Sequence, residues 1–236
     1  TTNPPSLSHG PEAYLPTMDT PDSVGPISEP PKQADFEAVT WLNAGTRNFY
    51  TIDTPSNTPA DLRGLKIRVQ QSPTNARMME LLGGSATPMG FGDVYTALQA
   101  QMLDGAENNE LALTDNGHGD VCKYYSYTMH QMIPDILIGN LGFMDGLSQE
   151  ERAIFDEGFQ ILNQTQREAW TDAVEAAKDK AQNEQGVNFI YPDISPFQEA
   201  GAPLHEAMPA SSPALAPSHE RLQGHSAELP APVWWK

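Results

Sequence analysis

The side chains best suited to hold a small organic acid lie between Asp61 and Asn109. Arg68 stands in a run that alternates apolar and polar residues, Phe91 follows a loop, and the amides Asn108 and Asn109 close the stretch. A guanidinium offers a planar fork of donors that matches a carboxylate, and an amide can both donate to and accept from a hydroxyl. This set favours binding of an acid and includes no group that would convert it.

A second group of side chains, His118, Asp120, Cys122 and His130, could suggest a metal or a thiol enzyme. Their spacing matches no zinc pattern, and Cys122 is the only cysteine, which excludes an internal disulfide and a cysteine-based metal site. The sequence contains no G-x-S-x-G, no P-loop and no G-x-G-x-x-G. We therefore expect a protein that is not an enzyme and that uses no cofactor or metal.

The charge of the chain limits its partners. A formal net charge of −18 repels nucleic acid and anionic lipid surfaces, so we expect neither nucleic-acid binding nor direct lipid binding. Exposed charges more than about 8 Å apart are largely screened at physiological salt, so the local balance decides whether an anion binds. Residues 41–77 are locally basic, with five basic residues against Asp53 and Asp61: Arg47, Arg63, Lys66, Arg68 and Arg77.

Proline marks the boundaries of the chain's regions. Eight of the 21 prolines lie in residues 1–35, six lie in residues 201–236, and seven lie in the 165 residues between. Neither end has a sustained apolar period, so we expect both proline-rich ends to be disordered or loosely attached. Residues 36–200 form the region that we expect to fold.

The middle region alternates predicted strands and helices, which predicts an α/β fold with a largely parallel sheet. A capping box at Ser148–Glu151 opens the longest predicted helix, which keeps a helical apolar rhythm to about Gln185 before Gly186 ends it. Its roughly 35 residues would span about 50 Å, a length that suits a helix crossing two lobes. The shorter predicted elements are strands at 65–69, 133–138 and 187–191 and helices at 73–82 and 94–102.

Three linked motifs occur in one order over about fifty residues: the KIRV strand at 66–69, the TPM-x-F-x-x-VYTALQ segment at 87–99 and the DGAEN turn at 104–108. Together they resemble the solute-binding proteins of TRAP (tripartite ATP-independent periplasmic) transporters. The resemblance covers roughly residues 36–200. It implies a periplasmic-binding-protein-like, two-lobed fold with a long lobe-spanning helix. It also leads us to expect that the first lobe is incomplete in this chain.

The resemblance assigns roles to two arginines. In the family, the arginine of the KIRV-type strand pairs with the ligand carboxylate, and Arg68 is the matching position. The segment Ala44–Tyr50 resembles the G-x-R segment that supplies a second arginine near the ligand, which corresponds to Arg47. The simpler interpretation of either residue is a solvated arginine on a surface.

The resemblance also assigns roles to residues of the DGAEN turn and to Phe91, which precedes it in the chain. Asn108 matches the asparagine that hydrogen-bonds the ligand's carboxylate or a neighbouring hydroxyl, and Asn109 adds a second amide; a helix cap is the structural alternative for both. Phe91 matches a residue that forms a wall of the binding cleft, although a core position is the alternative. Glu107 would repel a carboxylate, so we expect it to bind a hydroxyl or to fix the turn.

Within the family, the segments 46–51 and 105–128 look most like the branch that binds hexuronates such as glucuronate and galacturonate. The resemblance therefore implies a periplasmic receptor that captures a sugar acid and delivers it to TRAP membrane subunits. The alternative is a truncated or decayed paralogue that acts as a non-transport interaction or sensory module. Ligand-induced thermal stabilisation separates these two hypotheses.

Overall fold

The computed structural model describes residues 35–211 and the side chains of residues 35–204. The prediction of disordered ends therefore falls, for residues 1–34 and 212–236, outside the described residues. The strands and helices longer than one turn follow in this order: β1 (Phe36–Leu42), β2 (Thr46–Thr51), β3 (Lys66–Val69), α3 (Pro73–Leu81), β4 (Ser85–Pro88), α4 (Val94–Gln99), β5 (Gly105–Asn108), α5 (Leu111–Thr114), β6 (Tyr124–Met132), β7 (Asp135–Asn140), α6 (Leu141–Asp145), α7 (Gln149–Asn183), β8 (Asn188–Ile190) and α8 (Ser195–Ser211).

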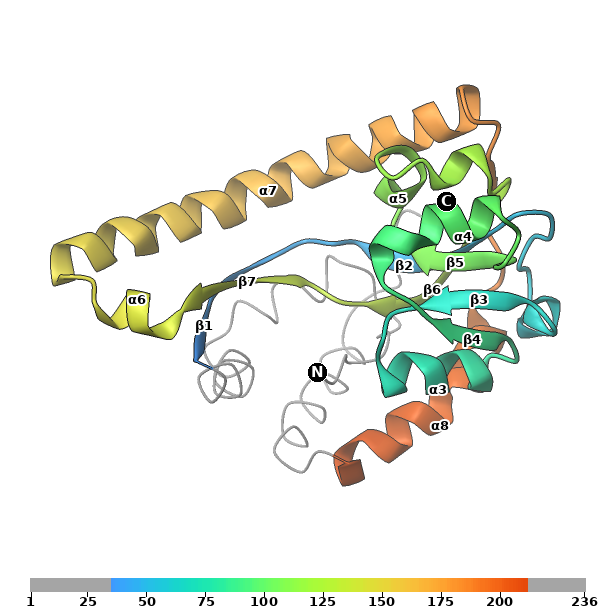
Figure 1. Ribbon diagram of the computed structural model, residues 1–236, viewed down its shortest axis with the longest axis horizontal. Helices are drawn as coiled ribbons and strands as arrows, with labels where there is room; N and C mark the ends of the chain where they lie inside the picture. Colours follow the sequence, from blue (N-terminus) through green and yellow to red (C-terminus); the bar gives the residue numbers. More distant parts are fainter. Residues whose placement is uncertain (1–34, 212–236) are drawn as a thin grey trace. The chain divides into compact units, whose positions relative to one another are not determined.

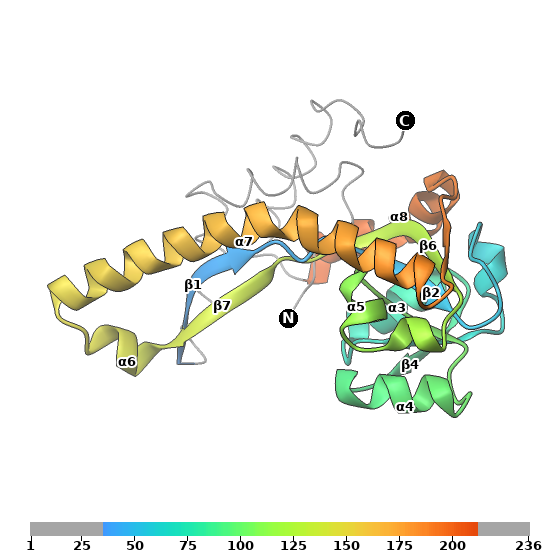
Figure 2. The same cartoon turned by 90° about the horizontal axis from the view of Figure 1, so that it is seen from above.

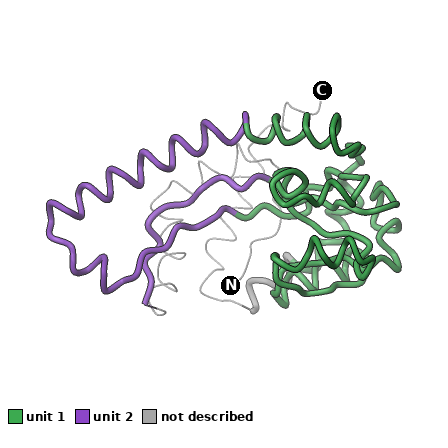
Figure 3. Tube along the Cα trace, turned by 45° about the horizontal axis from the view of Figure 1, so that its top comes forward, with its two compact units in different colours: residues 1–6, 46–133, 173–211 green, residues 7–45, 134–172, 212–236 purple. Residues whose placement is uncertain are grey.

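A six-stranded sheet with the order β4-β3-β5-β2-β6-β8 forms the centre of the first compact unit, which contains residues 46–133 and 173–211 (Figure 3). Strand β2 is antiparallel to both of its neighbours, whereas the pairs β3–β4, β3–β5 and β6–β8 are parallel. Five strands therefore run in one direction, which confirms the prediction of a largely parallel sheet. Strand β2 is not predicted by the sequence pattern, because buried polar residues such as Asn48 interrupt its apolar alternation.

Helices cover both faces of this sheet (Figure 1). On one face, Tyr50 and Tyr125 pack with α4, α5 and Ala181 near the end of α7. On the other face, Phe49 and the β3 residues pack with α3 and with Phe197 of α8. Because successive residues of a strand point to opposite faces, the neighbours Phe49 and Tyr50 contribute to different cores.

The second compact unit contains, among the described residues, 35–45 and 134–172. Strands β1 and β7 pair antiparallel, with Phe36 opposite Asn140 and Leu42 opposite Asp135. The first part of α7 is tied to β1 by a salt bridge of 2.8 Å between Arg152 and Glu37. Asn163 adds a hydrogen bond from its side-chain amide to the carbonyl of Trp41.

Helix α7 is the longest element, with 35 residues (Figure 2). It contributes residues to both units (Figure 3). Its predicted capping box is present: the Ser148 hydroxyl and backbone N–H donate to the Glu151 carboxylate, and the Glu151 N–H donates back to the Ser148 hydroxyl. Gly186, with φ of 70°, follows the helix in the left-handed region that glycine adopts most easily. The α/β fold class and the long helix are therefore confirmed.

Two predicted boundaries and one predicted exposure differ from the structure. Helix α4 ends at Gln99 rather than near Met102, whose side chain points to solvent. Helix α8 continues to Ser211, past the boundary predicted at Ala200, because Phe197, Ala200 and Leu204 pack together against the sheet. Arg68, expected on the polar face of a half-buried strand, is nearly completely buried by the helices and loops on that face.

Candidate functional site

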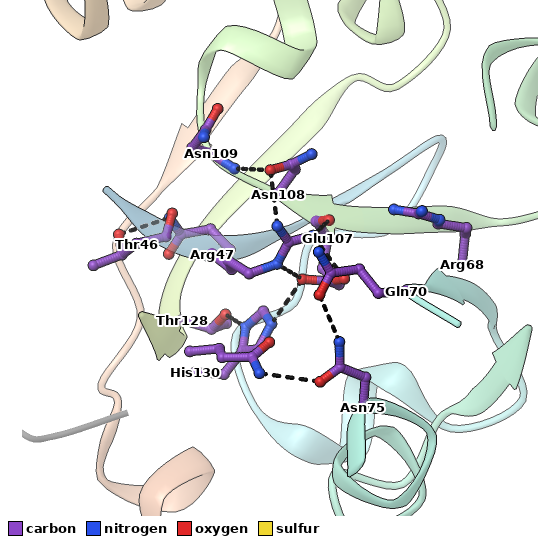
Figure 4. A network of polar contacts seen from close by, with 12 residues as sticks. Thr46, Arg47, Arg68, Gln70, Asn75, Glu107, Asn108, Asn109, Thr128 and His130 are labelled. Atoms are coloured by element: carbon purple, nitrogen blue, oxygen red, sulfur yellow. Dashed lines mark hydrogen bonds and ion pairs between the residues drawn. The ribbon is translucent and has the colours of Figure 1, made fainter. Parts of the chain in front are cut away.

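The predicted site residues meet at the end of the sheet where the parallel strands finish. Arg68 lies near the carboxyl end of β3, and Asn108 is the last residue of β5. Strand β2 runs the opposite way, so Arg47 near its start lies at the same end of the sheet. Figure 4 shows Arg68, Arg47 and Asn108 together with Glu107 and Asn109.

Strand register decides which face each side chain uses. Ala106 lies beside Arg68 on β3 and opposite Tyr50 on β2, so these three residues and Asn108 share one face of the sheet. Glu107 lies opposite Phe49 and therefore belongs to the other face.

Within the described residues, Arg68 is held by a backbone carbonyl and not by an acid. Its Nε and Nη2 donate to the Met89 carbonyl at 3.0 and 2.8 Å, and its Cζ lies 5.4 Å from the centroid of the Phe91 ring. The residue is 3% exposed, and burial is the main cause that lowers its pKa, although an arginine stays charged at neutral pH. Of its five N–H groups, two are used. No other hydrogen bond of this guanidinium is found within residues 35–204, so its Nη1 edge remains available.

Arg47 and Glu107 form a buried ion pair. The Arg47 Nη2 donates to Glu107 Oε1 at 2.9 Å and to the Glu107 carbonyl at 2.8 Å, and Nε contacts Oε2. Burial alone would raise the pKa of Glu107, but the Arg47 charge, the nearby His130 imidazole and the Arg47 hydrogen bonds together lower it to about 2. Glu107 is thus an ionised carboxylate that fixes Arg47.

His130 lies next to this ion pair, on the face of the sheet where Phe49 packs with α3 and α8. Its ring stacks on Phe49 at 4.1 Å between centroids, and its Nδ1 is 2.8 Å from the Thr128 hydroxyl. The Nε2 atom lies 3.6 Å from Glu107 Oε2, slightly beyond direct hydrogen-bonding distance. Burial is the largest effect on the pKa of His130 and lowers it, so the imidazole is neutral at neutral pH.

The two amides differ in their contacts. Asn108 Oδ1 accepts from Arg47 Nη1 at 3.1 Å and from the Asn109 backbone N–H at 2.9 Å. Because its oxygen is occupied, Asn108 presents its Nδ2 group as a donor, and no partner of Nδ2 is found within the described part of the chain. Asn109 is half-buried and follows the strand directly.

His118 lies near Arg68, an arrangement that the sequence analysis did not predict. Its Nδ1 is 2.8 Å from the Tyr50 hydroxyl, and its ring lies 5.5 Å from the Phe91 ring, edge to face. Burial, and secondly the Arg68 charge, lower the pKa of His118 to about 4. Strand register and loop packing bring His118 here, so no local motif could have indicated it.

The described structure gives no support to thiol or metal chemistry at the group formed by His118, Asp120, Cys122 and His130. Cys122 is buried, and burial raises the pKa of its thiol to about 12. No cluster of three or more His, Cys, Asp or Glu side chains suited to a metal occurs among residues 35–204. Within the same part of the chain, every helix is too short or too polar to cross a bilayer.

The chain is similar to several solved structures. A TRAP periplasmic solute-binding protein from Anaerococcus prevotii, solved with bound α/β-D-glucuronate, is 58% identical, with a TM-score of 0.92 over 96% of this chain and 73% of that chain. A TRAP periplasmic solute-binding protein from Xanthobacter autotrophicus, solved with bound β-D-galacturonate, is 30% identical, with a TM-score of 0.87 over 93% of this chain and 72% of that chain.

A curated relative from Salmonella typhimurium, the uncharacterised protein YiiZ, is 38% identical over 90% of this chain. The chain spans 64% of the length of that relative. Residues 27–212 match the model of the DctP family, described as bacterial extracellular solute-binding protein, family 7. This is a family of solute-binding receptors and not of enzymes. From the motifs at the end of the sheet, the fold and these matches, we conclude that the chain belongs to the DctP family of bacterial extracellular solute-binding proteins.

Proposed function

We propose that this protein is a periplasmic receptor that binds a hexuronate, such as glucuronate or galacturonate, and delivers it to TRAP membrane subunits. The observation that carries the proposal is Arg68: a residue that is 3% exposed, whose guanidinium is fixed on one edge by the Met89 carbonyl and has no partner on its other edge within residues 35–204. A buried cation that has no carboxylate partner within the described residues is costly to maintain. An incoming carboxylate would supply the missing partner.

The neighbouring side chains suit the rest of a sugar acid. Asn108 directs an unused N–H₂ group from the same face of the sheet, and this group can donate to a carboxylate or hydroxyl oxygen. Phe91 is 38% exposed and packs against Arg68, so its ring can form a wall beside the ligand. Asn109 supplies a second amide next to Asn108.

Arg47 contributes differently from Arg68 in this proposal. Its guanidinium is already paired with Glu107 and Asn108, so it orients the Asn108 amide and leaves one Nη1 proton for the ligand. Glu107 is fully buried and cancels most of the Arg47 charge. We therefore assign Glu107 to holding Arg47 and not to direct contact with the sugar.

The resemblance to hexuronate-bound structures supports the choice of ligand. The Anaerococcus prevotii structure was solved with glucuronate and the Xanthobacter autotrophicus structure with galacturonate, and both align over more than nine-tenths of this chain. The amides at Asn108 and Asn109 can satisfy sugar hydroxyls. A site with such donors discriminates against an acid that lacks hydroxyls, because its polar groups would remain unpaired.

Isothermal titration calorimetry with D-glucuronate, D-galacturonate, sialic acid and succinate tests the proposal. We expect 1:1 binding of a hexuronate in preference to succinate and sialic acid. Tighter binding of succinate would reject the hexuronate assignment. If none of the four acids binds or raises the melting temperature, the chain does not act as a receptor for these acids, and the non-transport hypothesis would be favoured; a ligand at 100 times its Kd should add about 2.7 kcal/mol to the free energy of unfolding.

A further inference from the structure

The His118 side chain is nearly completely buried, yet only one of its two ring nitrogens has a protein partner. The residue is 1% exposed, and its Nδ1 interacts with the Tyr50 hydroxyl at 2.8 Å. No partner of Nε2 is found within residues 35–204. This nitrogen is not among the fully enclosed side-chain atoms that lack a partner, so solvent or a ligand atom can reach it.

The surroundings of Tyr50 determine which nitrogen of His118 carries the proton. Tyr50 is fully buried, and His118 Nδ1 is the only hydrogen-bond partner of its hydroxyl within the described residues. If Nδ1 carried the proton and donated it to Tyr50, the phenolic O–H would be left without an acceptor. The O–H of Tyr50 therefore donates to Nδ1, and the proton of the neutral imidazole lies on Nε2. His118 thus presents a fixed N–H donor.

This donor lies beside the parts of the proposed site that would hold the acid. The Phe91 ring contacts both residues: Arg68 Cζ lies 5.4 Å from its centroid, and the His118 ring lies 5.5 Å away, edge to face. Tyr50 shares its face of the sheet with Arg68 and Asn108. A sugar ring whose carboxylate meets Arg68 would therefore carry its hydroxyls past Phe91 towards His118.

The backbone around His118 is held firmly. Lys123 Nζ donates to the carbonyls of Gly119 and Asp120 at 3.0 and 3.1 Å and to that of Gln185 at 2.7 Å. Gln185 Nε2 donates in turn to Asp120 Oδ1 at 3.0 Å. These contacts fix the short turn at His118–Asp120, so the imidazole is positioned before a ligand arrives.

We infer that His118 is a specificity-determining residue that donates a hydrogen bond from Nε2–H to a hydroxyl oxygen of the bound sugar acid, with Tyr50 as the positioning residue that fixes its tautomer. The inference rests on the proposed function, because it names a further contact of the same site. It assigns to His118 the recognition of a hydroxyl, and to Arg68 the recognition of the carboxylate.

The test compares two acids, D-glucuronate and tetrahydropyran-2-carboxylate, which keeps the ring and the carboxylate but lacks the hydroxyls. We expect His118→Phe to weaken glucuronate binding about tenfold and to leave tetrahydropyran-2-carboxylate unchanged, because one neutral hydrogen bond is lost. His118→Gln, which retains an N–H donor, should recover most of the glucuronate affinity. His118→Phe leaves the Tyr50 hydroxyl without its hydrogen-bond partner. The double variant Tyr50→Phe/His118→Phe also removes that hydroxyl, and it should show the same loss of glucuronate affinity, with tetrahydropyran-2-carboxylate unchanged, as His118→Phe. Tyr191→Phe, just after the edge strand β8 and stacked on Tyr127, is the control and should bind both acids like the parent.

Imidazole ¹⁵N NMR of the parent protein provides a measurement that needs no variant. The free protein should show the Nε2–H tautomer of His118, and glucuronate, but not tetrahydropyran-2-carboxylate, should shift the Nε2 resonance. The inference is overturned if the proton lies on Nδ1, if both acids shift Nε2 alike, or if His118→Phe binds glucuronate like the parent while Arg68→Lys weakens both acids. That last outcome would leave the proposed function intact, whereas a parent protein that binds neither acid would contradict the proposed function itself.

Discussion

At the scale of single residues, Arg68 combines three properties that surface arginines lack: burial, a fixed orientation and an unoccupied edge. Its planar fork can fix the plane of a carboxylate, which a lysine ammonium cannot do. We therefore expect Arg68→Lys to weaken hexuronate binding by about 2–5 kcal/mol, roughly thirtyfold or more, with little change in the fold. Titration calorimetry measures the affinity, and circular dichroism checks the fold.

The matched control for this variant is Arg77→Lys on α3. The Arg77 side chain is exposed and pairs with Glu80, three residues away on the same helix, so its replacement should leave affinity unchanged. Equal affinity of the Arg68→Lys variant and the parent would mean that Arg68 does not meet the carboxylate and that the site is misplaced.

Glu107 is a second residue with a testable effect: we expect it to make the free energy of unfolding depend on pH. The pKa of Glu107 is lowered in the folded protein from 4.5 to about 2. Its stabilising contribution is therefore fully present above the unfolded-state pKa and is lost as the pH falls from about 4.5 towards 2. Glu107→Gln leaves the buried Arg47 charge unpaired, so we expect it to destabilise the protein by about 3–5 kcal/mol at pH 7 and to lose less stability on acidification.

Urea denaturation at pH 7 and at pH 3 measures both effects of Glu107→Gln. Glu80→Gln, which replaces an exposed carboxylate on α3, is the control and should change the free energy of unfolding little at either pH. The ion-pair interpretation fails if the Glu107 variant keeps the stability of the parent at pH 7.

At the scale of elements, close contact between β5 and β2 positions the turn that carries Asn108. A Cβ atom at Gly105 would lie 2.5 Å from the Tyr50 carbonyl and 2.8 Å from Thr51 Cγ2, so only glycine fits without a shift of the strands. We expect Gly105→Ala to destabilise the protein by about 1–3 kcal/mol, and also to weaken hexuronate binding because β5 moves. Thermal unfolding and calorimetry measure the two effects.

The control for Gly105→Ala is Gly158→Ala in helix α7. A Cβ at Gly158 meets nothing within 4 Å, and alanine is favoured over glycine within a helix by about 0.5–1 kcal/mol. Gly158→Ala should therefore stabilise the protein slightly. Similar effects of the two alanine substitutions would show that the strand contact at Gly105 is not tight.

At the scale of the whole molecule, the long helix α7 exposes apolar side chains. Ile154 and Ile161 are 64% and 58% exposed, and Phe155 and Leu162 are also exposed. An exposed apolar face promotes association. We expect the double variant Ile154→Gln/Ile161→Gln to self-associate less than the parent at high concentration, as measured by sedimentation velocity.

The control for the double variant is Gln160→Asn, an exposed polar substitution on the same helix that should leave association unchanged. A parent protein that stays monomeric at high concentration would mean that this face is not an association surface.

The sequence by itself determined the elements whose signals are local. The capping box at Ser148 and the glycine after α7 set the ends of a 35-residue helix, and the KIRV alternation set β3. The linked motifs also indicated the family and predicted Arg68 and Asn108 as site residues. These features depend on backbone capping, apolar period and residue type, which neighbouring residues along the chain already fix.

Only the tertiary structure decided how these residues act together. Strand β2 has an irregular apolar pattern, and its pairing with β5 is what joins Arg47 to Glu107 across sixty positions. The Met89 carbonyl that orients Arg68, and the approach of His118 to Tyr50 and Phe91, likewise depend on register and loop packing. The sequence determines the charge and the hydrogen-bonding groups of each side chain. Which donor remains unused depends on contacts between distant segments, because each partner is supplied by a different strand or loop.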